Sequence, residues 1–448
     1  MHLLSETMVA ATGPAPAHPK VYPEIEPRTL GDPRAFVNGH PFATYARLRE
    51  EAPVAWQTEL DDREPGFWAI TRYEDVARVN SDPITFSSQK GGILMSAGPP
   101  ETRHPLLFRA SMDTMINMDA PWHLQLRKEH MPFFTPRYLN TLRERVAQES
   151  TRLLDGVESH GGECDLVETV SSRLPLFTLC EILGVPEADR PKFLNWMHYL
   201  ELAQSLAADR SKIAEPTIEL MQFIQAFNEN VSEMFEYGLH MLKKRRDDPQ
   251  EDMMTAIARA KVDGGYLPDE YLDGSWLLIV FAGNDTTRNT ISGAMKLLTE
   301  HPDQKAKLIA DPSLLPNATD EFIRMVSPVI YMRRTASADV EVNGQMIGEG
   351  EKVVMFYGAA NRDASVFENP DRLDVARPNA AKHLAFGLGP HVCLGKRVAQ
   401  LQLEEVYRQI LQRFPDMEYS GGIDIAPGNF VHAIRKLPVR FTAGRKAA

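Results

Sequence analysis

Cys393 lies in the segment with the clearest chemical signal, Phe386–Gly395, whose sequence is FGLGPHVCLG. Gly387 and Gly389 permit backbone turns that are closed to other residues. An amphipathic helix is predicted over residues 396–414, so Cys393 would lie just before a helix N-terminus. The positive end of that helix and its free N–H groups favour a thiolate over a thiol. A thiolate held in this way is a strong axial ligand for haem iron.

A polar run, Ala282–Thr287 (AGNDTT), interrupts the apolar stretch Trp276–Gly283 (WLLIVFAG). Buried polar groups need hydrogen-bond partners. The Thr286 hydroxyl can bond to the carbonyl of Ala282, four residues earlier, and such a bond bends a helix. Together with Gly283, which weakens the helix, this predicts a polar notch in an apolar wall. Taken alone, the run is also compatible with a kink that has no chemical role.

Both segments resemble motifs of the cytochrome P-450 family. Every fixed position of the family's haem-binding loop, Phe-Gly-x-Gly-x-His-x-Cys-x-Gly, is filled, and the run ending in Asp285-Thr286 resembles the oxygen-activating segment. Further family motifs occur in the family's order, so the resemblance covers nearly the whole chain. It implies the cytochrome P-450 fold: a triangular, mostly α-helical single domain with small β-sheets. We expect that domain over residues 28–448, after a flexible arm at residues 1–27.

The resemblance implies a haem-thiolate monooxygenase that inserts one oxygen atom from O2 into a C–H bond of a small hydrophobic substrate. The cofactor would be haem b (iron protoporphyrin IX), with Cys393 as the iron ligand. Thr286 would hold dioxygen and water by hydrogen bonding, and Asp285 would relay protons from solvent. The loop would also contact the cofactor through Phe386, His391 and Gly395.

Haem carries two propionates, which need cationic or donor partners when they are partly buried. His123 and Arg127 are four residues apart on one helical face and match the family's His-x-x-x-Arg motif. Arg334 fits the family's strand arginine, with Arg333 as its only rival, and His391 is the fourth candidate. A zinc site at His391 and Cys393 is disfavoured, because no second Cys/His cluster completes a tetrahedral set.

Glu321 and Arg324 are three residues apart on one helical face and are surrounded by apolar residues. An exposed ion pair of this spacing would be worth only about 0–1 kcal/mol. The pair matches the family's Glu-x-x-Arg motif, which is buried and helps to shape the cysteine loop. The resemblance implies a third partner, for which Arg372 is in the family position and Arg377 is a weaker alternative. These residues are structural.

The family's substrate pocket is lined by four segments, and none of their residues is charged here. They contribute Ile93, Leu94, Met95, Leu278, Ala282, Val329, Ile330, Phe430 and Val431. For each residue taken singly, core packing is the simpler interpretation. Together they favour an apolar substrate such as an alkyl chain, a terpenoid, a steroid or an alkylaromatic.

The composition excludes several classes of protein. The 448 residues include 49 Lys and Arg against 61 Asp and Glu, a net charge of −12, so no global basic field attracts nucleic acid or anionic lipid. No stretch reaches the roughly 18 consecutive apolar residues of a membrane span. The three cysteines, Cys164, Cys180 and Cys393, are too few for a disulfide framework. A soluble, cytoplasmic protein is therefore expected, with Cys164 and Cys180 as ordinary buried cysteines.

The elements that must position these residues are mostly helical. One continuous helix is predicted from residue 268 to about residue 300, which would be roughly 50 Å long. Short helices are predicted from residues 41 and 73, and a strand at 66–71. Residues 87–109 read as a long loop. After Pro328 the pattern predicts short strands at 337–342 and 352–357, with a turn at Asn343-Gly344.

No flavin or iron–sulfur domain is evident, so electrons are expected from a separate ferredoxin and its ferredoxin reductase. A basic patch flanking the cysteine loop would steer an acidic ferredoxin. It consists of Lys128, Arg137, Lys396 and Arg397. A monomer is expected. Two alternatives remain open: a peroxide-driven haem-thiolate peroxygenase, which the Asp285-Thr286 pair disfavours, and a haem-binding sensor or carrier without catalysis.

Overall fold

Helices make up most of the chain in the computed structural model, which describes residues 29–60, 64–96, 103–208 and 217–444. The expected N-terminal arm, residues 1–27, lies outside these ranges. Within them, the helices are α1 (Phe42–Glu51), α2 (Tyr73–Ser81), α3 (Pro105–Met112), α4 (Trp122–His130), α5 (Pro136–Ser159), α6 (Arg173–Leu183), α7 (Arg190–Ala208), α8 (Ile218–Asp247), α9 (Met253–Ala258), α10 (Asp269–Ala282), α11 (Asp285–Glu300), α12 (Pro302–Ala310), α13 (Leu315–Val326), α14 (Tyr357–Ala360) and α15 (Lys396–Arg413).

The strands are short. They are β1 (Val54–Gln57), β2 (Phe67–Ile70), β3 (Phe86–Ser87), β4 (Glu163–Asp165), β5 (Lys261–Val262), β6 (Gly265–Tyr266), β7 (Tyr331–Ala336), β8 (Val340–Val342), β9 (Gln345–Ile347), β10 (Lys352–Phe356), β11 (Glu418–Tyr419), β12 (Asp424–Ala426), β13 (Ala433–Lys436) and β14 (Pro438–Arg440).

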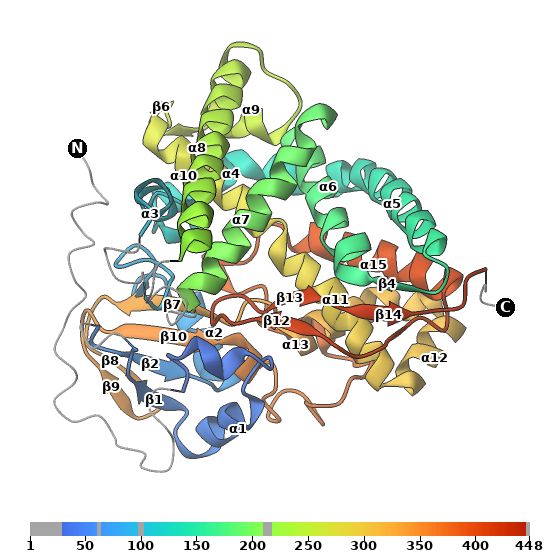
Figure 1. Ribbon diagram of the computed structural model, residues 1–448. Helices are drawn as coiled ribbons and strands as arrows, with labels where there is room; N and C mark the ends of the chain where they lie inside the picture. The colour runs from blue at the N-terminus through green and yellow to red at the C-terminus, as the bar shows by residue number, and fades with distance from the viewer. Residues whose placement is uncertain (1–28, 61–63, 97–102, 209–216, 445–448) are drawn as a thin grey trace.

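The largest sheet joins segments that are far apart in the sequence. Its order is β1-β2-β10-β7-β3, with β2 and β10 parallel and the other pairs antiparallel. It lies with α1 and the β8–β9 hairpin at one corner of the molecule, at the lower left of Figure 1, and helices fill the rest. Alternate residues of β2 face two apolar clusters: Phe67 packs on one side, Trp68 on the other. The sheet is therefore buried on both faces.

The helix predicted from residue 268 to 300 is broken in two. α10 ends at Ala282 and α11 begins at Asp285, with Gly283 and Asn284 between them. Glycine is a weak helix former, and the φ of Asn284, −103°, lies about 40° from the α-helical value of about −63°. The polar run therefore does more than bend one helix: it separates two.

The turn predicted at Asn343-Gly344 is confirmed. Both residues have positive φ, 50° and 73°, as a two-residue turn between antiparallel strands requires. The turn joins β8 to β9, a strand that the sequence analysis did not predict. The strand predicted at 352–357 is β10, which pairs instead with β2 and β7. The loop predicted over 87–109 ends early, because α3 begins at Pro105.

Packing between helices builds the main core. The largest apolar cluster draws on α5, α6, α8, α10, α11, α13 and α15. α15 lies against α5 and α13, so the helix that follows the cysteine loop is anchored on two sides. Its Tyr407 hydroxyl also bonds to the carbonyl oxygen of Ile291 on α11 at 2.5 Å. The cysteine loop is thus attached to a rigid scaffold.

Candidate active site

The cysteine loop is a tight turn immediately before α15. The backbone N–H of Cys393 donates to the carbonyl of Phe386 at 2.8 Å and closes the loop. Gly387 and Gly389 have φ of 70° and 66°, as the sequence analysis expected. A Cβ on Gly389 would also lie 2.9 Å from Cα of Ser81, so glycine is required for close approach to α2. These contacts fix the position of the Cys393 sulfur.

The side chain of Cys393 is exposed to an internal cavity of about 350 Å³. Burial within the protein raises the pKa of the Cys393 thiol. The N–H groups of Gly395 and Lys396, and the charge of Arg127, oppose that rise. The helix terminus was expected from the sequence to favour the thiolate, but burial is the larger effect on this pKa.

The break between α10 and α11 forms another wall of this cavity. Ala282, Gly283, Asp285 and Thr286 all line it. The Thr286 hydroxyl donates to the carbonyl oxygen of Ala282 at 3.3 Å, as the sequence predicts. A Cβ on Gly283 would lie 3.1 Å from Cδ1 of Leu179, so a side chain there would crowd α6. The cavity therefore places a thiol and a polar notch within one enclosed space.

Asp285 lies at the start of α11 with only 19% of its side chain exposed. Its Oδ1 accepts from Nδ2 of Asn284 at 3.2 Å and is 3.7 Å from Nη2 of Arg288. Arg288 also pairs with Glu201 of α7, Nη1 to Oε2, at 2.7 Å. Burial raises the pKa of Asp285, while the Arg288 charge opposes the rise. Arg288 was not predicted as a site residue, although its i, i+3 spacing from Asp285 is visible in the sequence.

The four candidate propionate ligands line one edge of the cavity: His123 and Arg127 of α4, Arg334 of β7 and His391 of the cysteine loop. The His123 and His391 rings stack at 4.0 Å. Arg127 Nη2 donates to the carbonyl of Val392 at 2.7 Å, so α4 is tied directly to the loop. The structure thus brings all four together, and it selects Arg334 over Arg333, which does not line the cavity.

This edge fits a group with negative charge. Among the described residues, neither Arg127 nor Arg334 forms an ion pair with a carboxylate; their hydrogen bonds go to carbonyl groups and to the amide oxygen of Asn80. Burial and then the Arg127 charge lower the pKa of His123 to about 4. Burial and the charges of Arg334 and His123 likewise lower the pKa of His391. The guanidinium groups of Arg127 and Arg334 destabilise the protein when they are buried without an anion. The two carboxylates of haem would supply that anion.

Most of the predicted substrate residues also line the cavity, namely Ile93, Leu278, Ala282, Val329, Phe430 and Val431. Three predictions were wrong. Ile330 and Met95 are buried in the apolar cluster on one face of the five-stranded sheet and do not line the cavity. Leu94 does not line the cavity and is 36% exposed.

Further apolar residues complete this wall. They are Met115, Ile116, Phe134, Leu179, Ile182, Met253, Ile279, Phe281 and Met332. Leu179 and Ile182 lie three residues apart on α6, so their shared face was visible in the sequence. The sequence does not show what this face contacts, because α6 reaches the cavity only through packing with elements that are distant in the sequence.

The Glu321–Arg324 pair is fully buried, as the sequence analysis proposed. Arg324 Nε and Nη2 donate to the two carboxylate oxygens at 2.7 and 2.8 Å. The third partner, however, is Arg377, whose Nε lies 3.0 and 3.1 Å from the same oxygens. Arg372 was the wrong choice: its side chain is 65% exposed and lies 3.6 Å from Asp303. The chain carries Arg377 into the interior beside the Glu321 carboxylate, whereas it leaves Arg372 at the surface.

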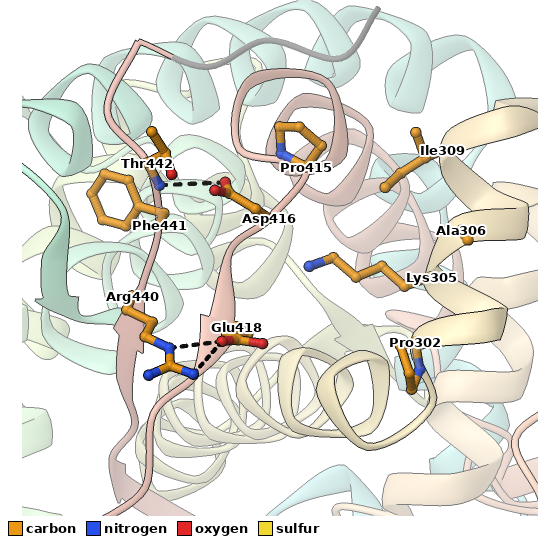
Figure 2. A pocket seen from close by; sticks show the side chains of 10 residues that line it. All are labelled: Pro302, Lys305, Ala306, Ile309, Pro415, Asp416, Glu418, Arg440, Phe441 and Thr442. Carbon is orange, nitrogen blue, oxygen red and sulfur yellow. Dashed lines mark hydrogen bonds and ion pairs between the residues drawn. The ribbon is translucent and has the colours of Figure 1, made fainter.

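A separate depression opens between α12 and the β11–β14 strands (Figure 2). Its charged groups already have protein partners. Arg440 pairs with Glu418 at 2.6 Å, and Lys305 Nζ donates to the carbonyl of Met417 at 2.5 Å. It shares no lining residue with the cavity at Cys393. The candidate chemistry therefore belongs to the internal cavity.

Comparison with known proteins agrees with this geometry. Residues 103–422 match the family model described as Cytochrome P450. The chain belongs to the cytochrome P450 family. Among its relatives, Cytochrome P450-terp of a Pseudomonas species is 32% identical over 442 residues, covering 94% of this chain and 98% of that protein. Linalool 8-monooxygenase of Pseudomonas putida is 34% identical over 426 residues, covering 93% and 99%.

Solved P450 structures share the whole fold. The Mycobacterium marinum cytochrome P450 CYP268A2 in complex with pseudoionone superposes with a TM-score of 0.81 at 36% identity, covering 91% of this chain and 97% of that one. The P450 fold as a single, mostly helical domain with small sheets is thereby confirmed. The protein is a P450 monooxygenase with a haem cofactor. No helix within the described ranges is both long and apolar enough to cross a bilayer.

Proposed function

We propose that this P450 inserts one oxygen atom from O2 into a C–H bond of a neutral, apolar small molecule. The observation that carries the proposal is a single cavity shared by the Cys393 sulfur, the Thr286 notch and an apolar wall. Cys393 would hold the iron, with Phe386 and Gly395 of its loop beside the cofactor. Bound haem supplies the activation of dioxygen and the transfer of oxygen.

The roles proposed for Asp285 and Thr286 concern protons. Asp285 is partly exposed and burial raises its pKa, so its carboxyl takes up a proton from solvent more readily than an ordinary aspartate does. The Thr286 hydroxyl donates its single hydrogen to the Ala282 carbonyl, and its oxygen opens onto the cavity, where it can accept a hydrogen bond from a water molecule. Asp285 would pass protons from outside, and Thr286 would hold the water molecule that carries them inside.

The proposed substrate class is a terpenoid or a molecule of similar size and polarity. Among the described residues that line the cavity, the cations are confined to the edge formed by His123, Arg127, Arg334 and His391. The wall formed by α6 and α10 is apolar and offers no partner for a substrate carboxylate. The relatives Cytochrome P450-terp and Linalool 8-monooxygenase, and the P450 structure in complex with pseudoionone, are consistent with this class. Alkyl chains, steroids and alkylaromatics are the alternatives to be compared.

The proposed cofactor form is haem b, held without covalent bonds to the protein. The sequence contains three cysteines. Cys164 lies on β4 and Cys180 is buried in α6, and neither lines the cavity. Only Cys393 reaches it, as the proposed iron ligand, so no thiol is left to attach a vinyl group. All three are free cysteines, which is compatible with a cytoplasmic location.

Electrons are proposed to come from a separate ferredoxin, itself reduced by a ferredoxin reductase. Lys128, Arg137 and Arg397 are exposed, and Lys396 lies over the Phe386 ring, 5.4 Å from its centroid. None of the four forms an ion pair within the described part of the chain. An acidic partner steered to these residues should reduce the iron more slowly as ionic strength rises. Reduction that is insensitive to salt would contradict the steering.

The decisive experiment combines ligation and turnover. The purified protein, reduced under carbon monoxide, should show the red-shifted Soret band of a thiolate-ligated haem. Turnover with a surrogate ferredoxin system should then yield hydroxylated linalool or pseudoionone in preference to palmitate. Turnover by hydrogen peroxide alone would favour a peroxygenase, and the absence of product from every substrate class would favour a sensor or carrier. Light scattering of the same sample tests the expected monomer.

A further inference from the structure

Three buried polar side chains from three separate elements form a chain along the cavity wall. Arg334 of β7 places Nη2 3.5 Å from Oδ1 of Asn80, at the end of α2. Asn80 Nδ2 in turn donates to the hydroxyl oxygen of Tyr357, the first residue of α14, at 2.9 Å. All three line the cavity, and each is only 3% exposed. No motif in the sequence marks Asn80 or Tyr357.

This chain lies directly against the cysteine loop. A Cβ on Gly387 would be 3.5 Å from Nδ2 of Asn80 and 3.6 Å from the hydroxyl of Tyr357. A Cβ on Gly389 would be 3.0 Å from the carbonyl oxygen of Asn80. Asn80 and Tyr357 therefore lie beside the cysteine loop, and Asn80 also contacts Arg334.

The hydrogen-bond directions leave a donor unused. Because the Tyr357 oxygen accepts from Asn80, its own hydrogen must point elsewhere, and no described residue accepts it. Arg334 carries its charge without a carboxylate partner in the same described set. A buried hydroxyl and a buried guanidinium each need an acceptor. One carboxylate placed in the cavity beside them would satisfy both.

We propose that Tyr357 and Asn80 complete the anion-binding edge of the haem site. Tyr357 donates its hydroxyl hydrogen to a haem propionate. Asn80 bonds to both Tyr357 and Arg334 and orients them so that both can bind that propionate. The proposal rests on haem binding in this cavity and adds two residues that the family motifs do not include. Tyr357 is a binding residue, and Asn80 is a positioning residue.

The first test measures haem retention in the holoenzyme. Tyr357→Phe removes only the hydroxyl, and haem transfer to excess apomyoglobin should become about tenfold faster, the scale of one hydrogen bond to a charged group. Tyr45→Phe is the matched control. Tyr45 is also fully buried, but its hydroxyl lies 3.4 Å from His40 and does not line the cavity. Its transfer rate should equal that of the wild type.

Reconstitution with haem dimethyl ester tests the propionate itself. The ester has no carboxylate, so wild type and Tyr357→Phe should release it at the same rate. A difference that persists with the ester, or equal release of ordinary haem by the two proteins, would overturn the proposal. The Soret band of the reduced carbon monoxide complex is recorded for each sample. If that band is normal while the rates are equal, the proposal fails and the monooxygenase assignment stands.

Asn80→Asp gives a second, independent test. A carboxylate at this position would lie within ion-pairing reach of Arg334 and compete with the propionate for it. Haem transfer should accelerate about tenfold or more, while the thermal unfolding of the apoprotein should not occur at a lower temperature. A purely structural role for Asn80 predicts the opposite pattern, with reduced stability of the apoprotein and unchanged haem transfer.

Discussion

Arg333 and Arg334 are neighbours on β7, yet their side chains serve opposite faces of the sheet. Arg334 lines the cavity and bonds to Asn80. Arg333 points away from it: Nη1 donates to the carbonyl of Leu94 at 3.3 Å, and Nη2 to the Thr335 hydroxyl at 3.2 Å. The alternation of an extended strand is sufficient to divide the two roles. Arg334 is therefore on the side of the edge proposed to bind the cofactor, and Arg333 holds the segment that carries Ile93.

The division predicts different consequences for two otherwise similar substitutions. Arg334→Gln should lower haem occupancy after purification, because it removes a cation from the propionate edge. Arg333→Gln should leave haem occupancy near the wild-type value but weaken binding of apolar ligands, because Ile93 loses its support. The ratio of Soret to protein absorbance measures the first effect, and titration of the spin-state shift measures the second. Equal loss of haem in both variants would refute the division.

The buried Glu321 site predicts a second contrast. Arg377→Ala removes one of two cations from a fully buried carboxylate and should destabilise the protein by about 3–5 kcal/mol. Arg372→Ala, at an exposed position, should change stability by about 0.5 kcal/mol or less. Urea unfolding monitored by circular dichroism compares the two. If Arg372→Ala proved the more damaging, the observed assignment of the third partner would be wrong.

The position of Thr286 predicts that its substitution will uncouple electron consumption from product formation. Thr286→Ala should lower the product formed per electron consumed by about tenfold or more, because the hydroxyl oxygen that would hold a proton-carrying water in the cavity is lost. Thr299→Ala is the control on the same helix. Thr299 makes the same kind of bond, to the carbonyl of Met295 at 2.9 Å, but lies outside the cavity. Electron consumption is measured as NADH oxidation, in parallel with an assay of the product. An unchanged ratio of product to NADH in Thr286→Ala would remove this residue from the mechanism.

The burial of Asp285 predicts that its substitution will lower activity and raise thermal stability, and that the gain in stability will depend on pH. Burial raises its pKa in the folded protein, so the ionised carboxylate costs stability. That cost is absent below the unfolded pKa of about 3.9 and grows as pH rises through the folded pKa. Asp285→Asn should therefore unfold at a higher temperature than wild type at pH 7, with the difference shrinking towards pH 4.

The same substitution should slow product formation by about 10²-fold, because the asparagine amide cannot relay a proton. Calorimetry at several pH values and steady-state rates check the two effects together. Arg288, Glu201 and Asn284 face Asp285 and remain in place in the variant. A less stable Asp285→Asn at pH 7 would show that its pairing with Arg288 outweighs the burial cost.

Motif residues were predictable from the sequence because local spacing determines them. Cys393 precedes a helix, Thr286 lies four residues from its acceptor, and Glu321 and Arg324 share a helical face; all three arrangements are local. Errors arose where the relevant partner is remote. The choice between Arg372 and Arg377 depends on how an irregular segment runs past α13, and no periodicity encodes that path.

The lining of the cavity shows the same limit. Ile330 and Val329 are adjacent and equally apolar, but only Val329 reaches the cavity. The bridge between Val329 and Val431, a hundred residues later in the chain, fixes which of the two faces inward. Asn80 and Tyr357 were missed for a related reason, since they meet only in the folded protein.

The parallel pairing of Trp68 on β2 with Val353 on β10 also has a kinetic consequence. Contacts between such distant parts of a chain form slowly, because a long loop must close before they are gained. The cavity itself needs both Asn80 and Val431, which are far apart in the sequence. A nascent polypeptide in which Val431 has not yet left the ribosome therefore lacks a complete receptor for its prosthetic group. We expect haem to be captured only after that residue has emerged, so cells starved of haem should accumulate colourless protein.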